Sequence, residues 1–125
     1  MSPQNYEDLE IYRMARALAA EIHRMTLEEL PGFEMYEVAS QLRRSSKSVV
    51  WNIVEGFGRR RYKAEFVRFL VYASASLDET KAQLDMLGLT GSLPPSRSAE
   101  LLSKAQLLGR KLYHFLRAVE DGHLS

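Results

Sequence analysis

The sequence predicts an all-α protein, an up-down antiparallel four-helix bundle, and three features of its 125 residues favour this fold. Apolar residues recur at helical spacing in four long stretches, and glycine and proline residues separate these stretches. No stretch alternates apolar and polar residues over a length that would favour a β-strand. Because long helices joined by short connections pack best as antiparallel neighbours, we expect one domain, residues 1–125, with one shared core.

The first helix is predicted over residues 6–27, with Asn5 as a candidate N-cap and Pro31-Gly32 as its end signal. Its apolar stripe consists of Ile11, Met14, Ala15, Leu18, Ile22 and Met25. The second helix is predicted over residues 34–55, and Gly56 and Gly58 are expected to end it. Its stripe consists of Met35, Val38, Ala39, Leu42, Ser46, Val49 and Ile53.

The third helix is predicted over residues 62–87, with Gly88 as the first of several residues that break it. Its stripe consists of Phe66, Phe69, Leu70, Ala73, Leu77, Thr80 and Leu84. The fourth helix is predicted over residues 96–120, with Ser96 as a candidate N-cap. Its stripe, at the spacing of side-by-side helix packing, consists of Leu101, Ala105, Leu108, Leu112, Leu116 and Val119.

Composition and motifs exclude several classes of function. The sequence contains no cysteine, which excludes disulfides, thiolate zinc sites and a cysteine nucleophile. We see no secretory signal, and no apolar run approaches the roughly 18 residues that cross a bilayer. We therefore expect a cytoplasmic protein with no membrane partner.

Catalytic and metal-binding patterns are poorly represented. Of the three histidines, only His123 has the Glu-x-x-His spacing of a di-iron bundle, with Glu120, and it lies near the end of the last helix. No glycine-rich phosphate loop is present, and Ser46 belongs to a core stripe rather than to a nucleophile–base pair. We predict no catalytic residue, no metal site and no cofactor, hence a non-enzymatic protein.

Positive charge is concentrated in one part of a chain whose net charge is only +1. Residues 41–68 carry two carboxylates, Glu55 and Glu65, against eight cations, namely Arg43, Arg44, Lys47, Arg59, Arg60, Arg61, Lys63 and Arg68. Arginine forks match phosphate oxygens in pairs, so we predict that these eight residues bind nucleic acid. A solvated loop remains the alternative for the run from Arg59 to Lys63.

Aromatic and apolar residues also fall outside the predicted core stripes. They are Tyr36, Trp51 and Val54 on the second helix and Tyr72 and Ala75 on the third. We predict that these residues form an oligomer interface, because aromatic side chains anchor such contacts. For Trp51, two alternatives stay open. It could stack on nucleic-acid bases beside the basic residues, or a loop of the same chain could cover it.

Several short motifs resemble those of a known family. They are Asp8-Leu9-Glu10-Ile11-Tyr12, Pro31, Gln41-Leu42-Arg43-Arg44-Ser45, Ser48-Val49, Asn52-Ile53, Glu55-Gly56, Arg68-Phe69-Leu70, Ala73, Ser76-Leu77 and Glu79. Across residues 6–93 the chain resembles the four-helix bundle protein family, first noted as reading frames within intervening sequences of bacterial large-subunit ribosomal RNA genes. The chain departs from the family's frequent residues with Val50 in place of proline and Val54 in place of alanine.

The resemblance implies a homo-oligomeric ring, since family members look like four-helix bundles that assemble into homopentamers. Related accessory proteins of diversity-generating retroelements bind nucleic acid and a reverse transcriptase. By this analogy the expected partners are further copies of the chain, RNA or DNA, and a nucleic-acid enzyme such as a reverse transcriptase. Arg43 and Arg44 are the cations that best match the family's motifs. The alternative function is a protein–protein interaction scaffold with no direct nucleic-acid contact.

Overall fold

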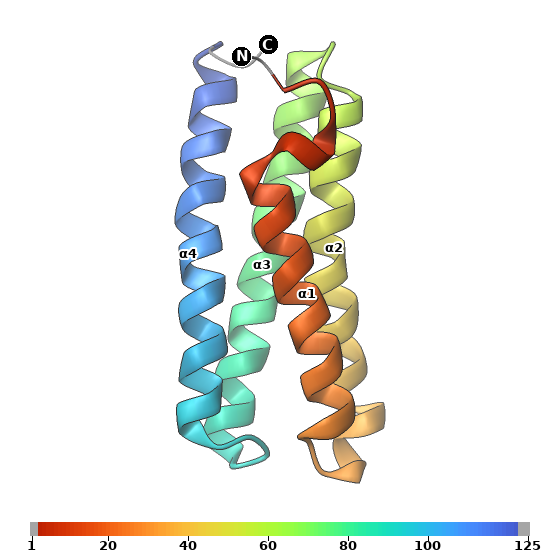
Figure 1. Ribbon diagram of the computed structural model, residues 1–125, viewed down its shortest axis with the longest axis vertical. Helices are drawn as coiled ribbons and strands as arrows, with labels where there is room; N and C mark the ends of the chain where they lie inside the picture. The colour runs from red at the N-terminus through yellow and green to blue at the C-terminus, as the bar shows by residue number, and fades with distance from the viewer. Residues whose placement is uncertain (1–2, 123–125) are drawn as a thin grey trace.

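The computed structural model describes residues 3–122, and within this range the chain is helical and contains no strand. Two short 3-10 helices, η1 (Tyr6–Asp8) and η2 (Gly32–Tyr36), accompany the α-helices. The α-helices are α1 (Glu10–Glu28), α2 (Val38–Gly58), α3 (Lys63–Thr90) and α4 (Pro95–Glu120). The predicted all-α bundle is confirmed, and the helices alternate in direction along the chain (Figure 1).

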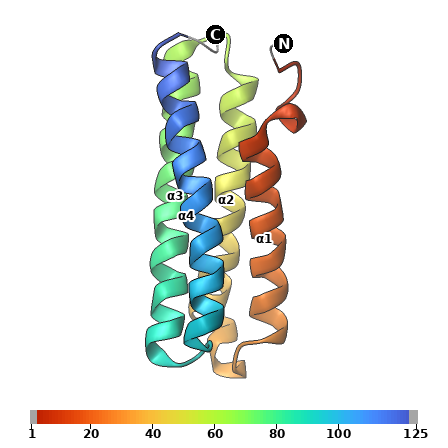
Figure 2. The ribbon, with the colours of Figure 1, turned by 60° about the vertical axis from the view of Figure 1, so that its left-hand side comes forward.

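The four α-helices stand side by side around one core. Helix α1 lies beside α2 and α4, and α3 lies beside α2 and α4, as the rotated view also shows (Figure 2). Each helix contributes one buried stripe, with Ile22, Leu42, Leu70 and Leu101 all fully buried. Because burial of a leucine or isoleucine side chain contributes about 1.5–3 kcal/mol, this shared core accounts for the association of the helices.

Two of the predicted helix ends are wrong, because Gly56 and Gly88 lie inside α2 and α3 instead of ending them. A Cβ atom on Gly56 would come within 3.1 Å of the Cβ of Phe69, so this glycine lets α3 approach α2 closely. Gly88 allows a similar approach of Ser98 on α4. The residue after α3 is Gly91, whose left-handed φ of 82° suits glycine at a helix end.

The predicted helix starts also differ from the structure. Asn5 accepts a hydrogen bond from the Glu7 amide at 3.0 Å, but it caps η1, and α1 begins only at Glu10. Residues 34–36 belong to η2, so α2 begins at Val38. Ser96 is not a cap, because α4 begins one residue earlier at Pro95, where the missing amide hydrogen costs no helical hydrogen bond.

Hydroxyl side chains form hydrogen bonds across the contact between α2 and α3, and an amide side chain of α2 lies beside them. Ser45 and Thr80 share a hydrogen bond of 2.9 Å, and Ser48 and Ser76 share another of 2.9 Å. Asn52 donates to the Ser48 carbonyl at 2.9 Å. These bonds satisfy polar groups that close packing removes from water, and they fix the rotation of α2 about its axis. The opposite side of α2 is therefore left for α1 and solvent.

Candidate functional site

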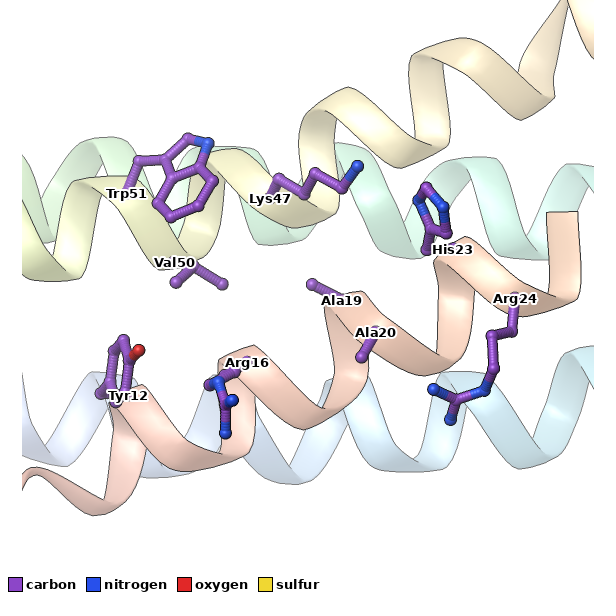
Figure 3. A pocket seen from close by; sticks show the side chains of 9 residues that line it. All are labelled: Tyr12, Arg16, Ala19, Ala20, His23, Arg24, Lys47, Val50 and Trp51. Carbon is purple, nitrogen blue, oxygen red and sulfur yellow. The ribbon is translucent and has the colours of Figure 1, made fainter. Parts of the chain in front are cut away.

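A hollow of about 440 Å³ lies between α1 and α2 (Figure 3). Its lining combines cations, aromatic rings and small apolar side chains, namely Tyr12, Arg16, Ala19, Ala20, His23, Arg24, Lys47, Val50 and Trp51. Ala19 and Val50 are buried where the two helices approach each other. The small alanines on α1 keep the hollow open, because larger side chains there would fill it.

The polar and aromatic side chains stand along the two rims. Arg16 and Arg24 project from α1, whereas Lys47 and Trp51 project from α2 (Figure 3). Tyr12 and Trp51 lie at one end of the hollow, and Arg24 lies near the other (Figure 3). At a rise of about 1.5 Å per residue, the stretch of α1 from Tyr12 to Arg24 is about 18 Å long.

The three cations of the hollow have no carboxylate partner. Within residues 3–122 neither Arg16, Arg24 nor Lys47 forms an ion pair, and no aspartate or glutamate lines the hollow. Arg16 and Arg24 are exposed, and Lys47 is half-buried. A concave surface lined by charges of one sign concentrates the field, so this hollow attracts anions.

Aromatic surface is available beside these cations. Trp51 is 64% exposed, although tryptophan is a side chain that proteins usually cover. Tyr12 is half-buried, and its ring meets that of Tyr6 edge-on, with 4.9 Å between the ring centroids. The Tyr6 contact holds Tyr12 in place, whereas most of the Trp51 indole faces solvent. The hollow thus offers one ordered and one open aromatic ring.

The eight predicted nucleic-acid-binding residues divide into two groups. Arg43, Arg44 and Lys47 lie in the first half of α2, and only Lys47 lines the hollow. Arg43 donates a hydrogen bond to the hydroxyl of Thr26 on α1 at 3.0 Å and is half-buried, whereas Arg44 is exposed. The remaining five surround the turn between α2 and α3, which starts about 18 Å along the helix axis from Lys47.

Carboxylates neutralise part of the second group. Arg59 pairs with Glu55 at 3.5 Å and with Glu65 at 3.1 Å. Arg68 also pairs with Glu65, at 2.9 Å, and this hydrogen-bonded contact raises the pKa of the Arg68 guanidinium. Two predicted cations therefore share one carboxylate, which lowers the positive charge that this end of the bundle presents.

The other residues of the turn differ in exposure. Arg60 lies 4.0 Å from the centroid of the Phe57 ring and donates to the Phe57 carbonyl at 2.9 Å, so it is partly buried. Arg61 and Lys63 are exposed and pair with no carboxylate of residues 3–122. The structure thus does not gather the eight residues into one surface, and it leaves Arg61 and Lys63 as the available cations of the turn.

Sequence analysis missed Arg16 and Arg24. Along the sequence their charge is hidden, because α1 contains about as many glutamates as arginines. The signal was present in the helical period. At about 100° per residue, Glu10 and Glu21 fall within about 20° of each other, whereas Arg16 falls far from both. A projection of charges down the helix axis would have separated Arg16 from the glutamates, whereas Arg24 falls within about 40–60° of Glu10 and Glu21 and could not be found in this way.

The five predicted interface residues lie on three elements. Tyr36 is 92% exposed but belongs to η2, so it does not share a helical face with Trp51 and Val54 of α2 as predicted. Tyr72 and Ala75 are exposed on α3. A ring can use two different patches of each subunit, and the interface assignment stays a prediction.

The described residues also bear on the predictions about metal binding and membranes. In residues 3–122 no three histidine or carboxylate side chains are grouped so that they could hold a metal ion. His123, the histidine with Glu-x-x-His spacing, lies outside the described residues. None of the described helices combines the length and the apolar character that crossing a bilayer requires.

Comparisons with known proteins agree with this architecture. A crystal structure of a protein with unknown function from the S23 ribosomal protein family, from Bacteroides thetaiotaomicron, is similar with a TM-score of 0.78 and 18% identity. The match covers 86% of this chain and 95% of that one, and it shows the shared fold. No curated protein matches the chain. Residues 7–114 match the 23S rRNA-intervening sequence protein family, and the chain belongs to that family.

Proposed function

We propose that this protein is a non-enzymatic accessory protein of the cytoplasm that binds nucleic acid through the hollow between α1 and α2. The observation that carries the proposal is the set of three cations there without a carboxylate partner, Arg16, Arg24 and Lys47. Unpaired cations on a concave surface bind the phosphate backbone without reading its sequence. The exposed Arg44, on the same helix as Lys47, and Arg61 and Lys63 at the bundle end would extend the contact.

Family membership also supports a role connected with nucleic acid, since the family's name refers to an intervening sequence of 23S ribosomal RNA. The proposal includes an accessory role beside a nucleic-acid enzyme such as a reverse transcriptase. It also includes assembly into a homopentameric ring, in which each hollow would be repeated and the positive field would increase with the number of copies. Mass in solution by light scattering tests the assembly.

Two matched substitutions test the binding surface. Ala20→Glu would place a carboxylate in the hollow, one helical turn from both Arg16 and Arg24. Gln106→Glu would add the same charge one turn before Arg110, in a hollow of about 410 Å³ between α3 and α4. Both variants have the same net charge, and both create a pair between a glutamate and an arginine four residues later.

We expect Ala20→Glu to weaken binding of a short RNA at least tenfold and to lower the slope of log affinity against log salt by about 1–2, because it competes for two cations. Gln106→Glu should leave both quantities near those of the parent. Equal losses in the two variants would show that net charge alone governs binding and would remove the hollow from the proposal. A parent protein that binds neither RNA nor DNA at low salt would end the proposal altogether.

A further inference from the structure

We infer that the hollow between α1 and α2 takes a single-stranded segment of nucleic acid, with one unpaired base stacked on Trp51 and the flanking phosphates held by Arg16, Arg24 and Lys47. This inference rests on the proposed function and specifies its substrate class. The carrying observation is the position of an indole with 64% exposure on the rim of a hollow whose charged side chains are all cationic.

The recessed position of the hollow favours a single strand. In a duplex the base faces are stacked on one another, and only their edges reach the grooves. A protein reads those edges by inserting a protruding helix or ribbon, whereas this site is a depression between two helices. An unstacked base has a free π-face, and an exposed aromatic side chain beside cations is the usual platform for it. Trp51 thus matches a base that is already unpaired.

The spacing of the cations favours a strand over a free nucleotide. Arg16 and Arg24 are eight residues apart on α1, so their attachment points are about 12 Å apart along the helix axis. Phosphates spread along a chain can engage both arginines and Lys47 on the opposite rim, whereas a single phosphate group engages one site at a time. The hollow is therefore matched to several consecutive nucleotides.

The floor of the hollow explains why a base would fit at the end near Trp51. Val50 is buried beside Trp51, and Ala19 faces it from α1 (Figure 3). An apolar floor excludes water from one face of a bound base while the cations stay on the rims. Tyr12 lies at the same end and adds a second aromatic edge. Base stacking and phosphate pairing can thus occur together without rearrangement of the helices.

Intrinsic fluorescence gives a direct readout, because Trp51 is the only tryptophan in the sequence. The parent protein is titrated with a ten-nucleotide oligouridine, with a ten-base-pair RNA duplex and with uridine monophosphate at low salt. We expect the oligouridine to quench Trp51 emission at the lowest concentration. The duplex should bind without comparable quenching, and the mononucleotide should bind at least tenfold more weakly than the oligouridine.

Two leucine substitutions separate stacking from general apolar contact. The variants are compared with the parent by the fluorescence anisotropy of dye-labelled oligouridine and duplex, because substitution of Trp51 removes the intrinsic signal. Trp51→Leu should weaken oligouridine binding about 5- to 150-fold, the range that corresponds to one base–aromatic stack, and leave duplex binding unchanged. Trp51→Phe should retain part of the affinity because it keeps an aromatic face. Tyr113→Leu removes an aromatic side chain that is 56% exposed on α4, and it should change neither affinity. Circular dichroism confirms that each variant is folded.

Each failure has a different meaning. If the parent binds none of the three probes, the proposed function fails together with this inference. If RNA binds but Trp51→Leu and the parent have the same affinity for oligouridine, the stacking inference is overturned and the proposed function stands. Equal affinity for uridine monophosphate and oligouridine would assign a mononucleotide pocket instead. If light scattering shows that Trp51→Leu forms a smaller assembly than the parent, Trp51 is a contact between subunits, as first predicted, and the inference is overturned.

Discussion

The charges on two sides of α1 differ in whether they form ion pairs. On the side of α4, Glu21 pairs with Lys104 at 2.7 Å and with Arg97 at 3.0 Å. Arg97 also pairs with Glu29 at 2.9 Å and with Glu100. The hydrogen bond to Glu29, followed by that to Glu21, raises the pKa of the Arg97 guanidinium. A further pair, between Glu10 and Lys111 at 3.2 Å, lies on the same side.

Around the hollow between α1 and α2, by contrast, the charges are unpaired in the part of the chain that the structure describes. Arg16, Arg24 and Lys47 surround the hollow without an ion pair within residues 3–122. Since α1 carries both signs of charge, the difference comes from which residues face which neighbour. The α4 side pairs its charges across two helices, whereas the cations of the hollow have no carboxylate partner within residues 3–122. One helix thus contributes both to a charged contact with its neighbour and to the proposed binding surface.

The largest expected effect is the loss of stability when one arginine is removed from each side. Arg97→Gln would leave Glu29 without this partner and Glu21 with Lys104 alone, and we expect a loss of about 1–2 kcal/mol in the free energy of unfolding, between the values for exposed and buried pairs. Arg24→Gln removes the same group from the hollow and should cost less than about 0.5 kcal/mol. Urea unfolding at pH 7 measures both. Equal losses would contradict the comparison.

The pH dependence of stability should come from the α4 side. The hydrogen bond from Lys104, followed by that from Arg97, holds the pKa of the Glu21 carboxyl below the usual 4.5. Because this pKa is lower in the folded state, the ion pairs contribute fully above about pH 4.5 and are lost as pH falls through the folded-state pKa. We expect Glu21→Gln to reduce stability by about 1 kcal/mol at pH 7.

That deficit should disappear in acid, because a protonated Glu21 resembles glutamine. Unfolding experiments from pH 7 down to pH 3 on the parent and on Glu21→Gln measure it. Glu100→Gln, which also removes a carboxylate beside Arg97, is the control, because Glu100 is more exposed and only one cation contacts it. A deficit for Glu21→Gln that is constant across this pH range would assign it to packing and not to charge.

The fold was predictable because burial imposes a regular period on each helix, and residues such as Leu42 and Leu70 stand in that period. The helix ends were less predictable. A glycine near a helix end can either cap the helix or admit a neighbour, and at Gly56 the deciding contact, Phe69, belongs to another helix. Position along the sequence does not distinguish these two uses.

The candidate site was predictable only in part, for a similar reason. Lys47 and Trp51 could be recognised because they lie outside the apolar stripe of their own helix. Arg16 was missed because its isolation from carboxylates depends on the rotation of α1 relative to its neighbours. Conversely, the sequence predicted Arg59 and Arg68 to be free to bind phosphate, whereas in the structure both pair with Glu65. Charge pairing across a turn depends on three-dimensional placement that composition does not contain.

The smallest expected effect is a change in the free energy of unfolding when a carboxylate is added to the hollow. Ala20→Glu places a carboxylate four residues from Arg16 and from Arg24, where each such helical pair contributes about 0.2–0.5 kcal/mol. Relative to Ala20→Gln, which has a similar helix propensity, we expect a gain of about 0.5 kcal/mol in the free energy of unfolding at low salt. The gain should nearly vanish at 1 M salt, because exposed charges are screened.

The direction of the stability change should differ between the two sides of α1. On the α4 side the existing pairs already satisfy the charges, so Glu100→Gln should lower stability or leave it unchanged. In the hollow, a single added carboxylate should raise stability and at the same time weaken nucleic-acid binding. Such opposite changes are expected where a surface keeps charges unpaired for binding at some cost to the stability of the fold. If Ala20→Glu is instead less stable than Ala20→Gln at low salt, Arg16 and Arg24 are already neutralised in solution, and the hollow has no unpaired charge to offer an anion.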